Sequence, residues 1–258
     1  MRSSQRITSS GMSFFLLLAM NMLSGGAVQA QSGAHASKPP SAATSSKPSS
    51  KTSPQAGAGA LPADVDPDSR YRLPLPRRED LDDYGKQVFD KLTDPTRSQH
   101  TGIRTPAGIR LHSPHVADTM SAAYSYLRRE TGFGDRLTEL AILVTGREMD
   151  SQYEWAAHEP AALKAGLEPA IIDIIKNNKP VTGLGEKETV IIKFGRELFG
   201  QRKVSSPTFA EALRLFGKRG VVDLASLMSL YVATSTLVNA FDMQMPEGRT
   251  PSLPPRKR

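Results

Sequence analysis

Cysteine is absent from the 258 residues of this chain. Without thiols the chain can form no disulfide, has no thiolate nucleophile and offers no sulfur ligand to a metal ion. A core built from this sequence must therefore hold together by packing and hydrogen bonds alone. Reactions that depend on a cysteine thiol are excluded.

The chain also lacks a long uninterrupted apolar run. The apolar residues 14–20 form a stretch that is too short to span a bilayer. Residues 221–240 are largely apolar, but Asp223 and several hydroxyl side chains interrupt them. We interpret this second stretch as a core or subunit-interface helix rather than a membrane span. The sequence thus predicts no stable membrane insertion.

Nucleic-acid and nucleotide signals are missing as well. The net charge is +7, yet the basic residues are scattered, and aromatic residues make up only 6% of the chain. A nucleic-acid partner would call for a clustered basic face with interleaved aromatics or a groove-reading motif. No glycine-rich phosphate or dinucleotide motif is present either. We expect no nucleic-acid partner.

Residues 1–30 have the features of a secretory signal. Arg2 and Arg6 precede the short apolar run, and the segment ends with small residues suited to cleavage at Ala30. An uncleaved membrane anchor is the alternative, but glycine, serine and asparagine break its apolar character after residue 20. The sequence therefore predicts an exported, periplasmic protein.

Composition divides the rest of the chain into three parts. Residues 31–65 are rich in Ser, Ala and Pro and have too little apolar surface to fold, so a disordered tether is expected. Residues 66–247 have the size and pattern of one folded domain. Residues 248–258 contain three prolines and a basic end, which predicts a flexible tail.

Apolar residues recur at helical spacing through most of the folded region. Pro95 and Gly166 are typical helix-end signals, and Gly166 is expected to be a left-handed cap. No series of strands and turns competes with this pattern, so we predict an all-α domain of seven or eight helices. Residues 93–110, rich in Thr, Gly, Arg and Pro, are predicted to be a loop. The expected helices cover residues 81–92, 115–130, 135–149, 152–164, 168–177, 185–199, 207–216 and 221–243.

A histidine and a glutamate provide the main candidate for chemistry. Glu154 and His158 are four residues apart in the predicted helix 152–164, so they share one face. A carboxylate beside an imidazole can orient it and tune it for proton transfer. For such a pair taken alone, an ion pair on the helix surface remains the alternative. His112 and His115 could suggest a metal pair, but Pro114 between them indicates a helix-start loop, and we expect no metal site.

The residues around this pair resemble a known superfamily. The run Tyr153-Glu154-Trp155-Ala156-Ala157-His158, with Ala162 and Gly166 after it, is similar to the signature of the carboxymuconolactone decarboxylase and alkylhydroperoxidase D superfamily. Residues 111–114, 184–188 and 239–242 also resemble that family, so the resemblance spans about residues 80–245. It implies an alkylhydroperoxidase D-like helical fold and assembly into a homo-oligomer.

The two branches of this superfamily make different demands on the chain. The alkylhydroperoxidase branch carries a glutamate, two cysteines and a histidine, and its spacing falls here on Glu139, Ser151, Glu154 and His158. Both cysteine positions are therefore replaced. A peroxidase of that branch needs one thiolate to attack the peroxide and a second thiol to resolve the product, so that activity is disfavoured.

The decarboxylase branch needs no thiol pair, and the resemblance implies a lyase without a cofactor. Its lactone substrate has a conjugated carbonyl that accepts the electron pair left by carbon dioxide. The resemblance makes His158 the candidate proton donor or electrostatic stabiliser, Glu154 its partner and Glu139 a second acid. The candidate substrate-binding residues are Arg147 as a carboxylate clamp, Tyr153 and Trp155 as pocket walls, and Ser151, which can also cap the helix.

Two functional interpretations follow from these residues. The first is a carboxymuconolactone decarboxylase-like lyase that acts on a small carboxylated lactone or related acid by proton transfer. The second is an exported, non-catalytic binding or structural protein on the same scaffold. Release of carbon dioxide from such a substrate distinguishes them.

Overall fold

The computed structural model describes residues 61–94, 96 and 102–255. The predicted signal segment and nearly all of the predicted tether lie outside these residues. The described chain contains a short 3₁₀ helix, η1 (Arg78–Asp80), eight α-helices and no β-strand. The prediction of an all-α domain is confirmed. The helices are α1 (Asp83–Thr93), α2 (Pro106–Leu111), α3 (Pro114–Arg129), α4 (Gly134–Glu148), α5 (Gln152–Lys164), α6 (Pro169–Lys176), α7 (Glu186–Gly200) and α8 (Ser206–Ala240).

Two elements differ from the sequence-based expectation. Helix α2 lies in the segment that was predicted to be a loop; it begins at Pro106, and the Thr105 side chain caps it by accepting a hydrogen bond from a backbone N–H. At six residues it is too short to show a helical period. In α8 the two predicted C-terminal helices are both present; they meet at Gly217, whose φ of 68° is not helical, instead of being separated by residues 217–220. Glycine allows this left-handed backbone without a steric penalty.

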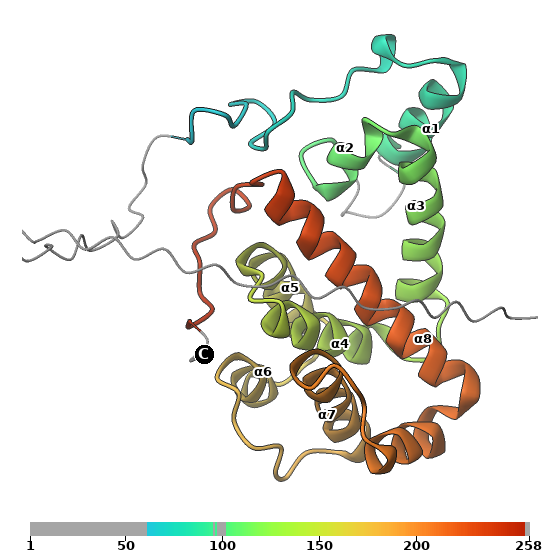
Figure 1. The fold of residues 1–258 in the computed structure, drawn as a ribbon, viewed down its shortest axis with the longest axis vertical. Helices are drawn as coiled ribbons and strands as arrows, with labels where there is room; N and C mark the ends of the chain where they lie inside the picture. The colour runs from blue at the N-terminus through green and yellow to red at the C-terminus, as the bar shows by residue number, and fades with distance from the viewer. Residues whose placement is uncertain (1–60, 95, 97–101, 256–258) are drawn as a thin grey trace, which may run out of the picture. The chain divides into compact units, whose positions relative to one another are not determined.

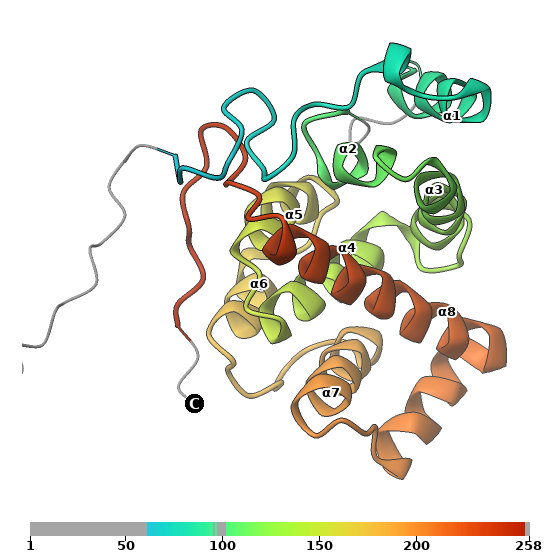
Figure 2. The ribbon, with the colours of Figure 1, turned by 45° about the horizontal axis from the view of Figure 1, so that its top comes forward.

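Helix α4 is the centre of the domain. It packs against α3, α5, α6, α7 and α8, and α8 also crosses α5 (Figures 1 and 2). All ten residues from Thr138 to Arg147 are buried. A helix enclosed on every side buries its polar side chains too, and this explains why Glu139 lies inside the fold.

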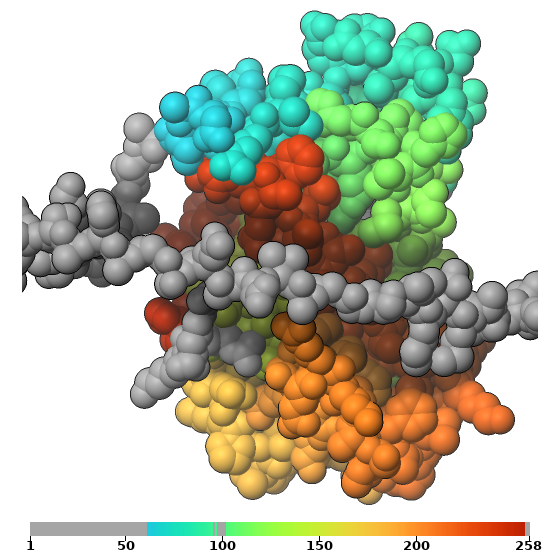
Figure 3. Space-filling view, viewed as in Figure 1, coloured from blue at the N-terminus to red at the C-terminus, as the bar shows by residue number. Residues whose placement is uncertain are grey.

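The ends of the folded region lie against the helices. The backbone N–H of Arg72 donates to Phe241 O at 2.9 Å, and that of Gln244 donates to Arg70 O at 2.9 Å. Figure 3 shows this N-terminal segment beside the C-terminal end of α8. Val65, which was assigned to the tether, is buried. Its apolar side chain gives the last residues of that segment a reason to pack.

The C-terminal segment returns along the domain. Leu253 is buried, and its carbonyl accepts a hydrogen bond from Gln152 Nε2 at 2.9 Å. Arg147 Nη1 donates to Pro254 O at 2.8 Å. The described part of the expected flexible tail, residues 248–255, is therefore docked on α4 and α5, because one leucine and two side-chain donors hold it there.

Helix α8 is long and apolar enough, by length and composition, to cross a membrane. In its most apolar 18-residue window, 56% of the residues are buried inside the domain. Tyr231, Leu224 and Leu227 of this helix contribute to the main hydrophobic cluster. Such burial is typical of a core helix, which agrees with our interpretation of its sequence.

Candidate functional site

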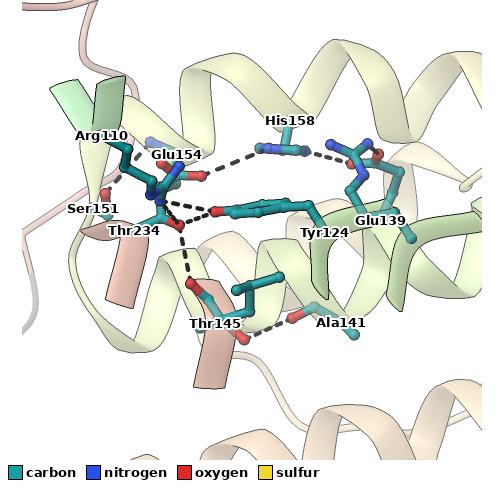
Figure 4. A network of polar contacts seen from close by, with 11 residues as sticks. Arg110, Tyr124, Glu139, Ala141, Thr145, Ser151, Glu154, His158 and Thr234 are labelled. Carbon is teal, nitrogen blue, oxygen red and sulfur yellow. Dashed lines mark hydrogen bonds and ion pairs between the residues drawn. The ribbon is translucent and has the colours of Figure 1, made fainter. Parts of the chain in front are cut away.

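A buried histidine lies between two glutamates at the junction of α4 and α5. His158 Nδ1 is 2.7 Å from Glu139 Oε2, and its Nε2 is 3.6 Å from Glu154 Oε2 (Figure 4). Glu139, Glu154 and His158 are 5%, 3% and 5% exposed. Glu154 and His158 are one turn apart on α5, whereas Glu139 comes from α4. The packing of α4 against α5 therefore brings the three side chains together.

Two local features set the geometry of this junction. The Ser151 hydroxyl caps α5 by accepting a hydrogen bond from the Glu154 backbone N–H at 3.4 Å. Asp150, the residue before the cap, has a positive φ of 50° and reverses the chain between the two helices. As a result α5 folds back beside α4, and His158 reaches Glu139.

An arginine fixes the charge at one end of this row. Arg128 Nη2, at the end of α3, donates to Glu139 Oε1 at 2.7 Å. A carboxylate paired with a guanidinium is an acceptor on both oxygens, so we assign the hydrogen of His158 to Nδ1. Nε2 then carries the lone pair and faces Glu154. Glu139, His158 and Glu154 thus form a row of groups that can exchange protons, and Arg128 keeps a fixed positive charge at its end.

A second arginine lies near Glu154 without a carboxylate partner. Arg110 is 8% exposed, and its Nη2 donates to Thr234 Oγ1 at 2.9 Å and to the Tyr124 hydroxyl at 3.2 Å. The hydroxyls of Tyr124 and Thr234 also bond to each other. Among the described residues no Asp or Glu oxygen comes within 4 Å of this guanidinium. A buried cation without an ion-pair partner is costly, and an anionic ligand would relieve that cost.

These groups surround one cavity. Its volume is about 270 Å³, and it is bounded by α2, α3, α5, α8 and the segment after α8. Apolar side chains form much of its wall, beside a few polar groups, as is common in sites for small molecules. The lining residues are Leu92, Thr105, Pro106, Ala107, Arg110, Ala117, Met120, Ser121, Tyr124, Arg128, Tyr153, Glu154, Ala157, His158, Tyr231, Thr234 and Pro246.

The arrangement of helices has a counterpart among solved structures. The chain aligns with the alkylhydroperoxidase AhpD core of an uncharacterized peroxidase-related protein from Ralstonia eutropha JMP134 at a TM-score of 0.55 and 17% identity. The alignment covers 71% of this chain and 98% of the other. This chain has the alkylhydroperoxidase D-like fold. Comparison with protein-family models and with curated proteins finds no match.

An alkylhydroperoxidase D-like fold does not bring thiol chemistry to this chain. The cavity polar groups are carboxyl, imidazole, guanidinium and hydroxyl, and the sequence contains no cysteine. Within the described residues no group of three or more His, Asp or Glu side chains has the arrangement of a metal site. The site can bind an anion and move protons.

Burial changes the acidity of Glu154. Loss of solvent raises the pKa of its carboxyl above the ordinary value, although His158, Arg110 and Arg128 act in the opposite direction. Its Oε1 is buried and has no hydrogen-bond partner among the described residues. Glu154 is therefore a carboxyl group that keeps its proton at a higher pH than usual, which suits a proton donor.

The raised pKa of Glu154 predicts a pH-dependent stability difference for Glu154→Gln. Folding favours the protonated acid, so the wild type loses stability as the pH rises from the unfolded-state pKa, about 4.3, through the higher folded-state value. The glutamine variant is neutral throughout and lacks this loss. In urea unfolding at a series of pH values, the free energy of unfolding of the variant should therefore rise relative to that of the wild type, by up to about 1.4 kcal/mol per pH unit.

Exposed Glu130 provides the control, since Glu130→Gln should show no such gain with rising pH. If the free energy of unfolding of Glu154→Gln instead fell relative to that of the wild type as the pH rose, the ionised carboxylate would be the form that the fold stabilises.

The candidates from the sequence separate into two groups. Tyr153 lines the cavity together with Glu154 and His158, and Glu139 reaches it through His158. Trp155 is 0% exposed and belongs to the main hydrophobic cluster, and Ser151 is a helix cap. Neither of these two lines the cavity.

Arg147, the expected carboxylate clamp, also does not line the cavity. It is buried at the end of α4, where Nη1 donates to Asp150 Oδ1 at 3.2 Å and to Pro254 O. These contacts tie the C-terminal segment to the α4–α5 turn. Arg110 and Arg128 are the guanidinium groups of the cavity.

Besides Thr105 and Ser121, sequence reasoning missed five polar residues of the cavity. Arg110 fell in the segment predicted to be a loop, and Arg128 stood beside Arg129 at a helix end, where basic residues are common. Tyr124 and Tyr231 follow the apolar period of their helices and read as core. The hydroxyl at 234 was counted only as an interruption of an apolar helix. The missed residues are Arg110, Tyr124, Arg128, Tyr231 and Thr234.

Proposed function

We propose that this protein is a cofactor-independent lyase, similar to carboxymuconolactone decarboxylase, that removes carbon dioxide from a small carboxylated lactone or related acid. The observation that supports it best is the buried row of Glu139, His158 and Glu154 beside a cavity that also contains the unpaired guanidinium of Arg110. The proposed proton donor, Glu154, and the proposed anion-binding residue, Arg110, thus line the same cavity.

Charge distribution in the cavity indicates how a substrate would bind. An arginine that held the leaving carboxylate would stabilise the ground state and slow the reaction. We therefore assign Arg110 to an acid group that stays on the product. The leaving carboxylate would lie near the apolar wall, where Met120 and Ala117 offer it no compensating charge. This favours substrates with two acid groups.

The chemical step needs one proton and no redox partner. The bond between the substrate carbon and its carboxylate breaks, carbon dioxide leaves, and the electron pair moves into the conjugated carbonyl to give an enolate. Glu154 then delivers its proton to the carbon. His158 Nε2, whose lone pair lies 3.6 Å from Glu154, takes up a proton from solvent and passes it to the ionised Glu154. The imidazole is held in place by the Glu139 hydrogen bond.

We also propose export to the periplasm and assembly into a homo-oligomer. Export rests on residues 1–30, which lie outside the described part of the chain. Assembly is supported by the resemblance of the sequence and by apolar side chains on the domain surface, such as Val222 of α8, which is 64% exposed.

The function is tested by carbon dioxide release from carboxymuconolactone, with Arg110→Leu beside the wild type. A charge-assisted hydrogen bond to a buried anion contributes about 1.5–3 kcal/mol, so the variant should raise KM roughly 10- to 100-fold. Arg129→Leu is the control, because Arg129 is an exposed neighbour of the site that bonds Ser125. Its KM should stay within about threefold of wild type.

Two outcomes would contradict the proposal. Binding of the acid without release of carbon dioxide would favour the non-catalytic binding protein, since the Arg110 site alone can account for binding. An unchanged KM in Arg110→Leu would show that Arg110 does not bind the acid group of the substrate.

A further inference from the structure

Tyr231 on α8 is a buried phenol that the mechanism so far leaves unused. Its side chain is 2% exposed and lines the cavity. By strict geometric criteria the hydroxyl makes no hydrogen bond, but it does interact with the Arg128 guanidinium. A buried hydroxyl with one loose contact of this kind can still accept or donate a bond to a ligand in the cavity.

Two neighbours place this phenol beside the proton path. Its ring lies edge-on to the His158 imidazole, with centroids 5.1 Å apart and planes at 87°. The Arg128 guanidinium is close enough for each group to affect the pKa of the other. Arg128 is itself held by its hydrogen bond to Glu139. The hydroxyl is thus near both a fixed cation and the imidazole.

The ionisation states suit donation to an anion. Burial raises the pKa of Tyr231 well above its ordinary value, so the phenol keeps its proton at neutral pH. For Arg128, burial acts to lower the pKa, but the nearby Tyr231 and Glu139 outweigh it and the guanidinium stays charged. Both groups are donors whose orientation the fold fixes in advance.

The geometry points to Tyr231, together with Arg128, as the donor pair that stabilises the enolate oxygen formed when the substrate loses carbon dioxide. This inference rests on the proposed function. As the carbon–carboxylate bond breaks, its electrons move to the carbonyl oxygen, and that oxygen accepts hydrogen bonds from the phenol and the guanidinium. When the carbon is protonated, the pair returns to form the carbon–hydrogen bond and the oxygen becomes neutral again. Arg110 holds the retained acid, so the two arginines have separate tasks.

Tyr231→Phe tests the role of the hydroxyl. Removal of one donor to a developing oxyanion lowers kcat about 100-fold or more. KM should stay within about threefold, because the neutral carbonyl of the substrate gains little from the bond. The melting temperature should change little, since the variant keeps the packed ring and loses only the loose contact of the hydroxyl with Arg128. A purely structural role for the hydroxyl predicts the opposite pattern: lower stability with normal kcat.

Tyr126→Phe is the matched control. Tyr126 is on α3, two residues before Arg128, and its hydroxyl bonds Asp223 and Arg219 instead of lining the cavity. Its kcat should stay within about threefold of wild type. A Tyr231→Phe variant whose kcat is as little affected as that of the control would overturn the inference.

A binding measurement separates this inference from the proposed function. The probe is 4-hydroxy-3-nitrobenzoate, whose carboxylate suits Arg110 and whose coloured phenolate imitates the enolate oxygen. The wild type should bind the phenolate at least 10-fold more tightly than the phenol, and Tyr231→Phe should lose most of this preference. If that holds while no carbon dioxide is released, only the proposed reaction fails. If the wild type shows no preference for the phenolate, the donor pair is wrong, whatever the turnover.

Discussion

His158→Ala should lower the rate of carbon dioxide release by a factor of about 10² to 10⁴, the usual loss when a positioned proton-transfer group is removed. The imidazole contacts both Glu139 and Glu154, so its loss removes the link between the two acids. The measurement is kcat with saturating substrate, and the rate should recover in part when free imidazole is added to fill the space left behind.

His158→Gln separates proton transfer from structure. Glutamine can still donate a hydrogen bond to Glu139 but does not titrate, so its kcat should fall nearly as far as that of the alanine variant. His115→Ala is the control, because His115 stacks on Tyr84 away from the cavity. If His158→Gln kept kcat within threefold of wild type, the histidine would orient its neighbours without moving a proton.

Trp155→Ala should reduce the free energy of unfolding by about 3–5 kcal/mol, the usual cost of removing a large aromatic side chain from a core. Trp155 is 0% exposed in the main hydrophobic cluster, and Lys176 Nζ lies 5.7 Å from its ring centroid. The loss would appear in urea unfolding as a lower midpoint with little change in slope.

Leu163→Ala on the same helix is the control. Because Leu163 is half exposed, this substitution should lower the free energy of unfolding by about 1 kcal/mol or less. The sequence had offered Trp155 as a wall of the substrate pocket. A Trp155→Ala variant with near-normal stability and a raised KM would favour that earlier interpretation over its place in the core.

The helices themselves could be predicted because their signals are local. The 3.6-residue period, the prolines at helix starts and the glycine after α5 fix most of the elements, and Gly166 has the positive φ of 85° expected of a left-handed cap. The period fails for α2, which is too short to display one. It succeeds for the two helices that meet at Gly217 within α8, where the backbone is not helical.

The candidate site could be predicted only in part. Glu154 and His158 are neighbours on one turn of α5, so their pairing follows from spacing. An arginine clamp was expected because a guanidinium matches a carboxylate, but Arg147 lies outside the cavity that Arg110 lines, and nothing local distinguishes the two. The former meets a backbone carbonyl of the C-terminal segment, and the latter meets Thr234 across the fold.

By itself, the sequence determined three things about this protein: a helical domain, the absence of thiol chemistry, and a glutamate one turn from a histidine. The tertiary structure decided that Glu139, 19 residues away, bonds the other nitrogen of that histidine, and that Arg110 meets a hydroxyl 124 residues further along. Periodicity and capping act over a few residues, whereas these contacts depend on how α4, α5 and α8 pack. Only that packing encloses the cavity and removes water from Glu154, which raises the pKa of its carboxyl.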